Sequence, residues 1–251
     1  MDLVIKDTTL ATMRGNSIGI IRNGSLGVKE DKIAFVGPSD QLRIKGDPVV
    51  IDGSNHATMP GLVNAHTHSG RILLRGVAQV LPEIQWMTKG LGPFAKHMSG
   101  EDLVVGAQLA LVEGIRGDTT TWVEYSAKME KLLEYVFLPA HVRTITVETF
   151  NEVVGDTSRL KPTDPYQFDQ QKGDRGLKRA LDIKKKFAKH SLIKTMLGPQ
   201  ALDMVSLTKF KEITSIALEQ NLGVHTHLAQ GRREKMQIQA RFLKRITTFQ
   251  S

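Results

Sequence analysis

Short apolar segments separated by turn-forming residues fill the first 58 positions of the chain, a pattern typical of β-strands. Asn23-Gly24 and Glu30-Asp31-Lys32 lie where hairpin turns are expected. No cluster of titratable residues interrupts this pattern, so residues 1–58 are predicted to form a small β-sandwich with a structural role. Its predicted strands span residues 2–5, 18–21, 24–28, 32–37 and 48–52.

From residue 59 onward, strand-like segments alternate with longer segments of helical periodicity. After Ser99, a candidate N-cap, the apolar residues Leu103, Ala107 and Leu111 fall on one face of a predicted helix. Such alternation predicts βα units, a parallel sheet and an α/β fold. After a first strand that ends near residue 68, the predicted strands span 119–123, 141–147, 192–198 and 224–228, and the predicted helices span 101–116, 128–137, 175–189, 207–220 and a segment from 231 onward.

Two histidine pairs mark the ends of two predicted strands. His66 and His68 are two residues apart, so their side chains are expected on the same face of the strand. His225 and His227 repeat the spacing at the end of the fifth strand. Two neutral imidazoles on one face can hold a zinc-like ion with positions left open for water and substrate. The alternative is a pair of structural histidines whose hydrogen bonds are satisfied locally.

The words around these histidines resemble those of the amidohydrolase superfamily, in its aminohydrolase and chlorohydrolase branch. That branch includes proteins like S-adenosylhomocysteine/methylthioadenosine deaminases and triazine hydrolases. The resemblance covers nearly the whole chain and implies a TIM-like (β/α) barrel over residues 59–251, preceded by the small β-sandwich. The matching words are Pro-Gly-Leu-Val-Asn-Ala-His-Thr-His at 60–68, Leu-Leu-Arg-Gly at 73–76, Gly-Asp-Thr-Thr-Thr at 117–121, Leu-Gly-Pro-Gln-Ala at 197–201 and His-Thr-His-Leu-Ala-Gln at 225–230.

The resemblance also implies a chemistry. One divalent metal, zinc with iron as the alternative, would be held by His66, His68 and His227 at the C-terminal ends of the strands. Metal-bound hydroxide would attack a ring carbon of a small nitrogen heterocycle and expel ammonia, an amine or chloride. The implied activity is therefore hydrolysis of a carbon–nitrogen bond other than a peptide bond, or a dechlorination.

Four positions near the implied site depart from the family pattern or allow two interpretations. Gln230 stands where deaminases of the branch have a catalytic Glu, and an amide cannot transfer a proton as a carboxylate can. Glu234 is a candidate substitute acid/base, or a carboxylate in the first turn of a helix. Gln200 replaces a substrate-facing His and can still bind a ring edge. His225 either contacts substrate or packs one layer deeper than His227.

Residues 69–99 form a Gly- and Pro-punctuated segment that is long for a loop. Long ordered loops after barrel strands commonly shape the mouth of the active site. Trp86 and Phe94 are candidate walls for a flat substrate, with ordinary packing as the alternative.

A closed barrel of this type needs eight strands, and the sequence pattern supplies five. The chain is thus expected to be an incomplete barrel, which is either a truncated product or a part that completes itself by association. A non-catalytic paralogue that at most binds metal or self-associates is the alternative function. Self-association as a homo-oligomer is expected to cover the exposed strand edges.

The composition restricts the other classes of function. The chain has no cysteine, so a metal site must use histidine and carboxylate ligands. The net charge of +8 comes mainly from residues 231–251, which contain six basic residues and one acidic residue. No aromatic interleaving accompanies this charge, so a nucleic-acid partner is not expected. No apolar run has membrane length and no secretion signal is evident, so a cytoplasmic protein with no membrane partner is expected.

Overall fold

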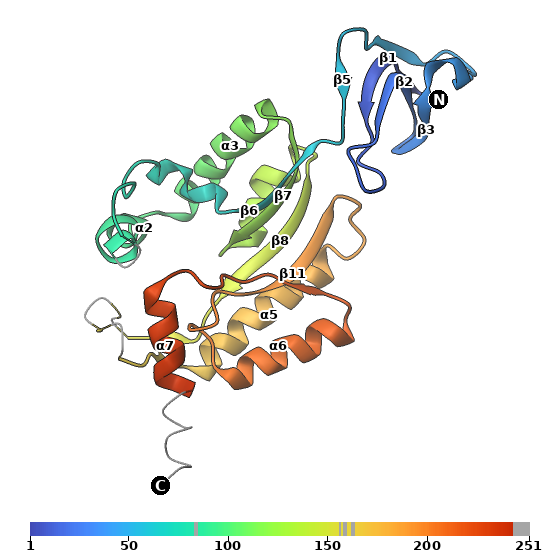
Figure 1. Cartoon of the computed structure of the whole chain (residues 1–251). Coiled ribbons are helices and arrows are strands. Elements are labelled where there is room, and N and C mark those ends of the chain that lie inside the picture. The colour runs from blue at the N-terminus through green and yellow to red at the C-terminus, as the bar shows by residue number, and fades with distance from the viewer. Residues whose placement is uncertain (83–84, 156, 158–159, 162–163, 243–251) are drawn as a thin grey trace. The chain divides into compact units, whose positions relative to one another are not determined.

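The computed structural model describes residues 1–251 except 83–84, 156, 158–159, 162–163 and 243–251 (Figure 1). The chain divides into two compact units, Met1–Leu62 and Val63–Ser251. The boundary expected from the sequence, between residues 58 and 59, lies just before this division.

The N-terminal unit contains one five-stranded sheet, so its predicted β-rich character is confirmed. The hairpin turn predicted at Glu30-Asp31 joins two antiparallel strands. The turn predicted at Asn23-Gly24 is wrong, because both residues lie inside one long strand where the pairing with its neighbour is irregular. The strands are β1 (Leu3–Ala11), β2 (Ile20–Lys29), β3 (Lys32–Pro38), β4 (Val49–Asp52) and β5 (Ala57–Thr58), in the order β3-β2-β1-β4 with β5 beside β1.

The second unit is built on another five-stranded sheet, with the order β12-β11-β8-β7-β6. The pairs β7–β8, β8–β11 and β11–β12 are parallel, which confirms the predicted α/β class and gives an incomplete, curled barrel. The strands are β6 (Leu62–Thr67), β7 (Thr119–Ser126), β8 (Arg143–Phe150), β11 (Ile193–Pro199) and β12 (Gly223–Val224).

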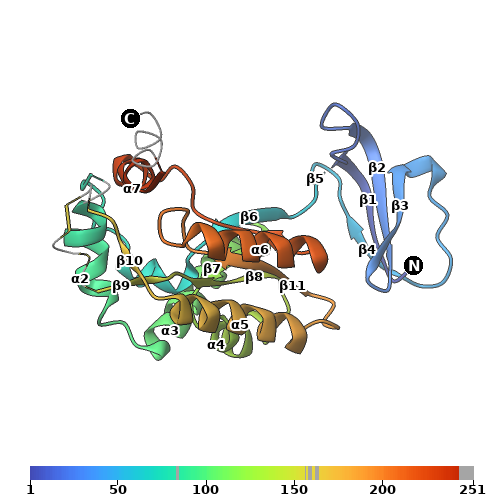
Figure 2. The same cartoon turned by 90° about the horizontal axis from the view of Figure 1, so that it is seen from below.

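Helices alternate with these strands, and α3, α4 and α5 lie along one face of the sheet (Figure 2). The helix predicted over 175–189 begins earlier, because the side chain of Asp169 caps it by accepting from the backbone N–H of Gln171 at 2.9 Å. The main helices are α3 (Gly100–Arg116), α4 (Met129–Leu132) with its π-helical continuation η4 (Leu133–Phe137), α5 (Gln170–Lys186), α6 (Leu207–Glu219) and α7 (Arg232–Phe242).

The segment after β6 folds into short helical turns rather than an extended loop. These turns are η2 (Ser69–Leu74), η3 (Trp86–Leu91) and α2 (Gly92–Ala95). Ser99 then starts α3 with a capping box, in which its hydroxyl accepts from the backbone N–H of Asp102 at 3.0 Å. The predicted N-cap is thus confirmed.

Strand alternation divides the core into two layers. On β7, Trp122 packs with the helices on the outer face of the sheet, whereas Val123 and Tyr125 pack with Val147 on the inner face. A second outer core joins α5 and α6 to the sheet; its buried residues are Phe150, Leu177, Ala180, Leu197, Ile213 and Ala217.

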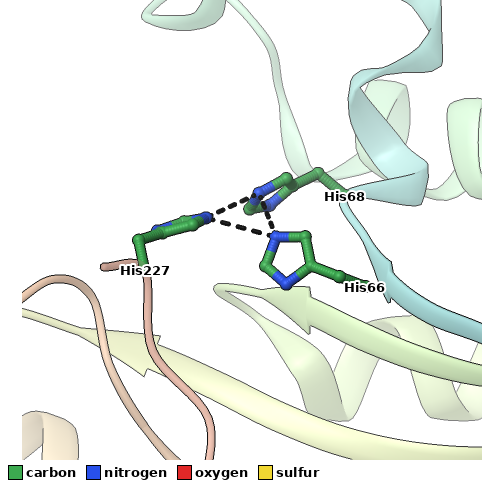
Figure 3. A group of neighbouring side chains, drawn as sticks. All are labelled: His66, His68 and His227. Atoms are coloured by element: carbon green, nitrogen blue, oxygen red, sulfur yellow. Dashed lines mark hydrogen bonds between the residues drawn. The ribbon is translucent and has the colours of Figure 1, made fainter. Parts of the chain in front are cut away.

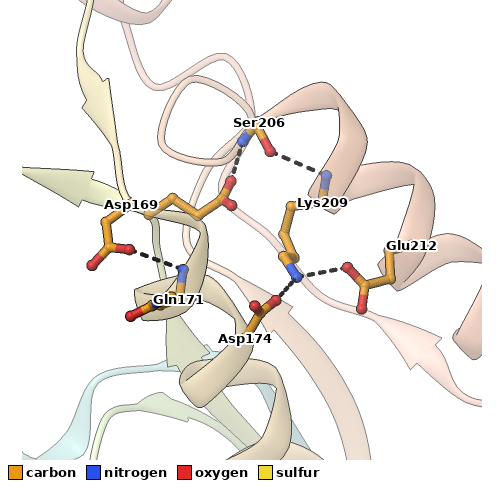
Figure 4. A network of polar contacts seen from close by, with 7 residues as sticks. Asp169, Gln171, Asp174, Ser206, Lys209 and Glu212 are labelled. Carbon is orange, nitrogen blue, oxygen red and sulfur yellow. Dashed lines mark hydrogen bonds and ion pairs between the residues drawn. The ribbon is translucent and has the colours of Figure 1, made fainter.

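A buried lysine links α5 to α6 (Figure 4). The side chain of Lys209 is only 2% exposed, and its ammonium pairs with Asp174 and, at 2.6 Å, with Glu212. Ser206 caps α6, because its hydroxyl accepts from the backbone N–H of Lys209 at 3.1 Å. The backbone N–H of Ser206 in turn donates to the buried Glu152. These contacts hold the start of α6 close to the C-terminal ends of β8 and β11.

Among the helices of the described residues, none combines the length and the apolar character needed to cross a membrane.

Candidate metal centre

Three imidazole rings converge at the C-terminal ends of the barrel strands (Figure 3). His66 lies near the end of β6, His68 follows that strand directly, and His227 follows β12. The three Nε2 atoms form a triangle in which every side measures 3.2 Å. The shared face expected for His66 and His68 is thus observed, and His227 joins them from 159 residues away.

This spacing fits the donor set of one metal ion. A tetrahedral zinc ion with bonds of about 2.0–2.1 Å to histidine nitrogens has ligand atoms about 3.3–3.4 Å apart. The observed 3.2 Å is close to that separation. Three protein ligands would leave a fourth position open, as in catalytic rather than structural sites. Imidazole suits both zinc and iron.

The surroundings of His227 select the tautomer that a metal needs. Its Nδ1 lies 2.8 Å from the backbone carbonyl oxygen of Gln200. A carbonyl only accepts, so Nδ1 carries the proton and Nε2 keeps its lone pair for the centre of the cluster.

Burial also favours the neutral form of His66 and His68. Burial is the main cause that lowers the pKa of His68 to about 4, with further contributions from Arg71, His227 and His66. Burial likewise lowers the pKa of His66, with contributions from His227 and His225. At neutral pH these nitrogens therefore do not have to lose a proton before they bind a cation.

The ring of Tyr125 packs against the rings of all three histidines. Its ring centre lies 5.1 Å from that of His66, 5.4 Å from that of His68 and 4.6 Å from that of His227. Its hydroxyl lies 2.8 Å from the carbonyl oxygen of Pro199 and 2.9 Å from that of Gln200, so its single proton is shared between these two acceptors. Sequence reasoning missed this residue because the predicted strand ended at Val123. Extending the strand alternation by one more pair would have found it.

A buried carboxyl group supports the backbone beside His68. Glu124 is fully buried on β7, and its two oxygens accept from the backbone N–H of Ser69 at 3.1 and 3.3 Å. Ser69 is the residue after His68. Burial raises the pKa of Glu124 to about 8.

Gln200 belongs to a chain of hydrogen bonds at the ends of β8 and β11. The ammonium of Lys172 donates a hydrogen bond to Oδ1 of Asn151 at 2.8 Å, and the backbone N–H of Val153 donates to the same oxygen at 3.0 Å. The Asn151 amide nitrogen must then be the donor to Oε1 of Gln200, at 2.5 Å. In the described part of the chain, the NH₂ group of Gln200 has no protein acceptor and is the free end of this relay.

The candidate acid/base residues lie at the start of α7. Gln230 is exposed, and its backbone N–H donates to Oε2 of Glu234 at 2.6 Å. Glu234 is 6% exposed, in the first turn of the helix. A carboxylate that accepts a backbone N–H at the start of a helix agrees with the structural interpretation of Glu234.

The two candidate aromatic walls are exposed, Trp86 by 39% and Phe94 by 51%. Within the described residues, neither ring contacts the three histidines. An open groove of about 860 Å³ lies instead beside the segment that follows His227. Its lining includes Leu202, Leu228, Ala229, Gly231, Glu234 and Met236.

Strand five is shorter than predicted. The ladder of β12 covers only Gly223–Val224, and the pairing resumes at a bridge between Ala201 and His227. Between these paired positions the β11 side has one residue more than the β12 side, which interrupts the ladder; Pro199, which has no N–H to donate, lies in this interval. His225 and His227 still donate their backbone N–H groups to Leu197, at 2.9 Å, and Gln200, at 3.4 Å.

Comparison with known proteins agrees with this architecture. Residues 57–250 match the amidohydrolase family. A 5-methylthioadenosine/S-adenosylhomocysteine deaminase of Halothermothrix orenii is 30% identical over 246 residues, which is 96% of this chain and 53% of that protein. The chain therefore spans about half the length of the curated relatives it matches.

Solved structures show the same fold. An adenosine deaminase from Xanthomonas campestris with bound zinc superposes with a TM-score of 0.81 at 24% identity, over 98% of this chain and 54% of that one. An atrazine chlorohydrolase from Arthrobacter aurescens complexed with zinc gives a TM-score of 0.70 at 17% identity, over 90% of this chain and 52% of that one. With a family match that covers most of its length, the chain belongs to the amidohydrolase family.

Proposed function

We propose that this chain carries the three-histidine metal site of an amidohydrolase that hydrolyses a carbon–nitrogen bond on a small nitrogen heterocycle. The observation that carries the proposal is the 3.2 Å triangle of Nε2 atoms at the strand ends. His66, His68 and His227 would hold one divalent ion, zinc before iron because both zinc-bound neighbours share the fold. When bound, the ion supplies Lewis-acid activation of water.

Deamination is the proposed reaction, since the curated relatives are named as deaminases of adenosine derivatives. Dechlorination is supported by structural neighbours below 20% identity, such as the atrazine chlorohydrolase at 17%. Gln200 would bind the substrate through its free NH₂ group, which can only donate. It therefore favours a ring with an acceptor nitrogen or a carbonyl oxygen at that edge. Trp86 and Phe94 are proposed as walls for the ring, because both are exposed enough to meet it.

Gln230 and Glu234 are the candidate residues for proton transfer. The amide of Gln230 can orient a polar group by hydrogen bonding but cannot exchange a proton with it. Glu234 is occupied by the backbone of Gln230, which favours a role in starting α7. A non-catalytic, metal-binding product is the second candidate, because Gln230 stands where deaminases of the branch have a carboxylate that can transfer a proton.

The test is the metal content of the purified chain. Elemental analysis after gel filtration is expected to find about one zinc per wild-type chain. A variant with His66, His68 and His227 changed to alanine is expected to contain none. His97→Ala is the matched control, because His97 is exposed and lies outside the cluster. A wild-type chain without metal would contradict the proposal.

An assay for ammonia release from adenosine derivatives separates the two candidates. Bound zinc with turnover supports the hydrolase, and bound zinc without turnover supports the metal-binding product. The proposed binding partner is a small heterocycle and not a nucleic acid.

A further inference from the structure

A fourth histidine, His225, is hydrogen-bonded to the side of the His66 ring that faces away from the other two histidines. Nε2 of His225 lies 2.6 Å from Nδ1 of His66, which is the nitrogen that faces away from the triangle. The two ring planes are inclined by only 14°, and their centres are 5.0 Å apart. That separation is what one hydrogen bond between two coplanar rings requires, so the rings meet edge to edge rather than face to face.

The position of the proton in this bond decides whether His66 can bind a cation. If His66 donates from Nδ1, its Nε2 is left with a lone pair that points at the cluster. If His225 donates instead, a neutral His66 must carry its proton on Nε2, where it would block the site. Only an acceptor at position 225 is compatible with a metal ligand at position 66.

We propose that His225 is a positioning residue, which accepts the Nδ1–H of His66 and thereby fixes the tautomer and the plane of that ring. The assignment rests on the proposed metal site. It differs from the substrate contact expected from the family resemblance, because the Nε2 atom of His225 is already used by His66.

The rest of the site supports this reading of His225. The backbone N–H of His225 donates to the carbonyl of Leu197 at 2.9 Å, and its ring packs 5.4 Å from the ring of Tyr125. His227 has a partner of the same kind, since its Nδ1–H donates to the Gln200 carbonyl. Two rings of the triangle are thus oriented by an acceptor outside it.

The test compares side chains at position 225 that differ in their ability to accept. His225→Gln places an amide oxygen near the position of Nε2, whereas His225→Leu has a similar size and no acceptor. Zinc affinity is measured on the whole chain by competition with a colour-forming chelator. The leucine variant is expected to bind zinc about 10- to 100-fold more weakly, as for other residues that orient a metal ligand, and the glutamine variant to recover most of that loss.

His97→Leu serves as the control for loss of an imidazole elsewhere, and thermal melting checks the fold of each variant. If the leucine variant does not fold, His225→Lys replaces it, because an ammonium donates and cannot accept. Zinc affinity that is equal in the wild type and the non-accepting variant would overturn the proposal. So would a folded glutamine variant as weak as leucine. A wild-type chain that binds no zinc would instead overturn the metal site itself.

Discussion

Burial favours the neutral form both of a histidine in the cluster and of the carboxyl group that lies next to it. Burial lowers the pKa of His68 and raises the pKa of Glu124, and both shifts favour the neutral form. A neutral imidazole is ready to bind a cation. A neutral carboxyl group of Glu124 can remain buried behind Ser69 without a counter-ion.

Glu124 therefore makes stability depend on pH. Its pKa rises from 4.5 to about 8 on folding, so between these values the native state holds a proton that the unfolded state has lost. Its contribution to the free energy of unfolding is fully present below pH 4.5 and is lost as the pH rises toward 8. Glu124→Gln should remove this fall, which urea titrations at pH 5, 7 and 8.5 would measure.

The matched control is Glu219→Gln, at the exposed end of α6. It should keep the slope of the wild type. Equal slopes for the wild type and Glu124→Gln across the same pH range would show that the carboxyl group does not titrate as the structure implies.

Lys172 should control the binding preference of Gln200. Lys172→Met removes one of the two donors to Oδ1 of Asn151 and leaves only the backbone N–H of Val153, so the amides of Asn151 and Gln200 are held less firmly in one orientation. Loss of one oriented hydrogen bond costs about 0.5–1.5 kcal/mol, which is about 2- to 12-fold in Kd. Weaker binding of adenosine at unchanged zinc content is expected, measured by calorimetry.

Lys172→Arg retains a donor and should lose less. Lys178→Met is the control on the same helix, because Lys178 pairs with the exposed Asp182 and not with Asn151 among the described residues. Unchanged adenosine affinity in Lys172→Met would show that the relay does not reach the ligand.

At the scale of elements, α6 depends on the buried stem of Lys209 more than on its charge. Both partner carboxylates are about half exposed, with Asp174 at 52% and Glu212 at 45%, so water can replace the ammonium. Lys209→Met should therefore cost less than about 1.5 kcal/mol, as for other volume-conserving changes. Lys209→Ala should cost about 2–4 kcal/mol because it leaves a cavity.

Urea unfolding of the two variants, with exposed Lys211→Ala as the control, measures these differences. A methionine variant as unstable as the alanine variant would assign the stabilisation to the ion pairs instead.

The elements themselves were predictable because they depend on local patterns. Apolar spacing and the cap at Ser99 define α3 within a few residues, and strand alternation places His66 and His68 on one face. The bond between His66 and His225 joins positions 159 apart, so no local pattern reports it. The free NH₂ of Gln200 is equally hidden, because it follows from Lys172 through Asn151.

Errors in the predicted elements have the same physical origin. Asn23-Gly24 has the composition of a hairpin turn, but pairing on both sides keeps it inside β2, and Asn23 takes a φ of 50° there. The fifth strand was predicted too long because the extra residue on the β11 side of the ladder cannot be read from residues 224–228.

At the scale of the whole molecule, the barrel sheet has two outermost strands, β6 and β12, in the described part of the chain. Unpaired backbone groups on an edge strand are a template for association with another chain. The outer face of α3 adds an apolar stripe, in which Val105 is 55% exposed, Leu109 44% and Val112 57%. These three residues recur at helical spacing, so they form one continuous surface.

The chain as given should therefore self-associate. Sedimentation at increasing concentration is expected to show species heavier than the 27.8 kDa chain. Val105→Gln, Leu109→Gln and Val112→Gln together should shift this equilibrium toward the monomer, because they remove apolar surface without changing charge. Leu218→Gln on α6, a single residue that is 85% exposed, should shift it less. A monodisperse wild-type monomer that melts cooperatively would mean that the exposed edges and the α3 stripe are tolerated in water.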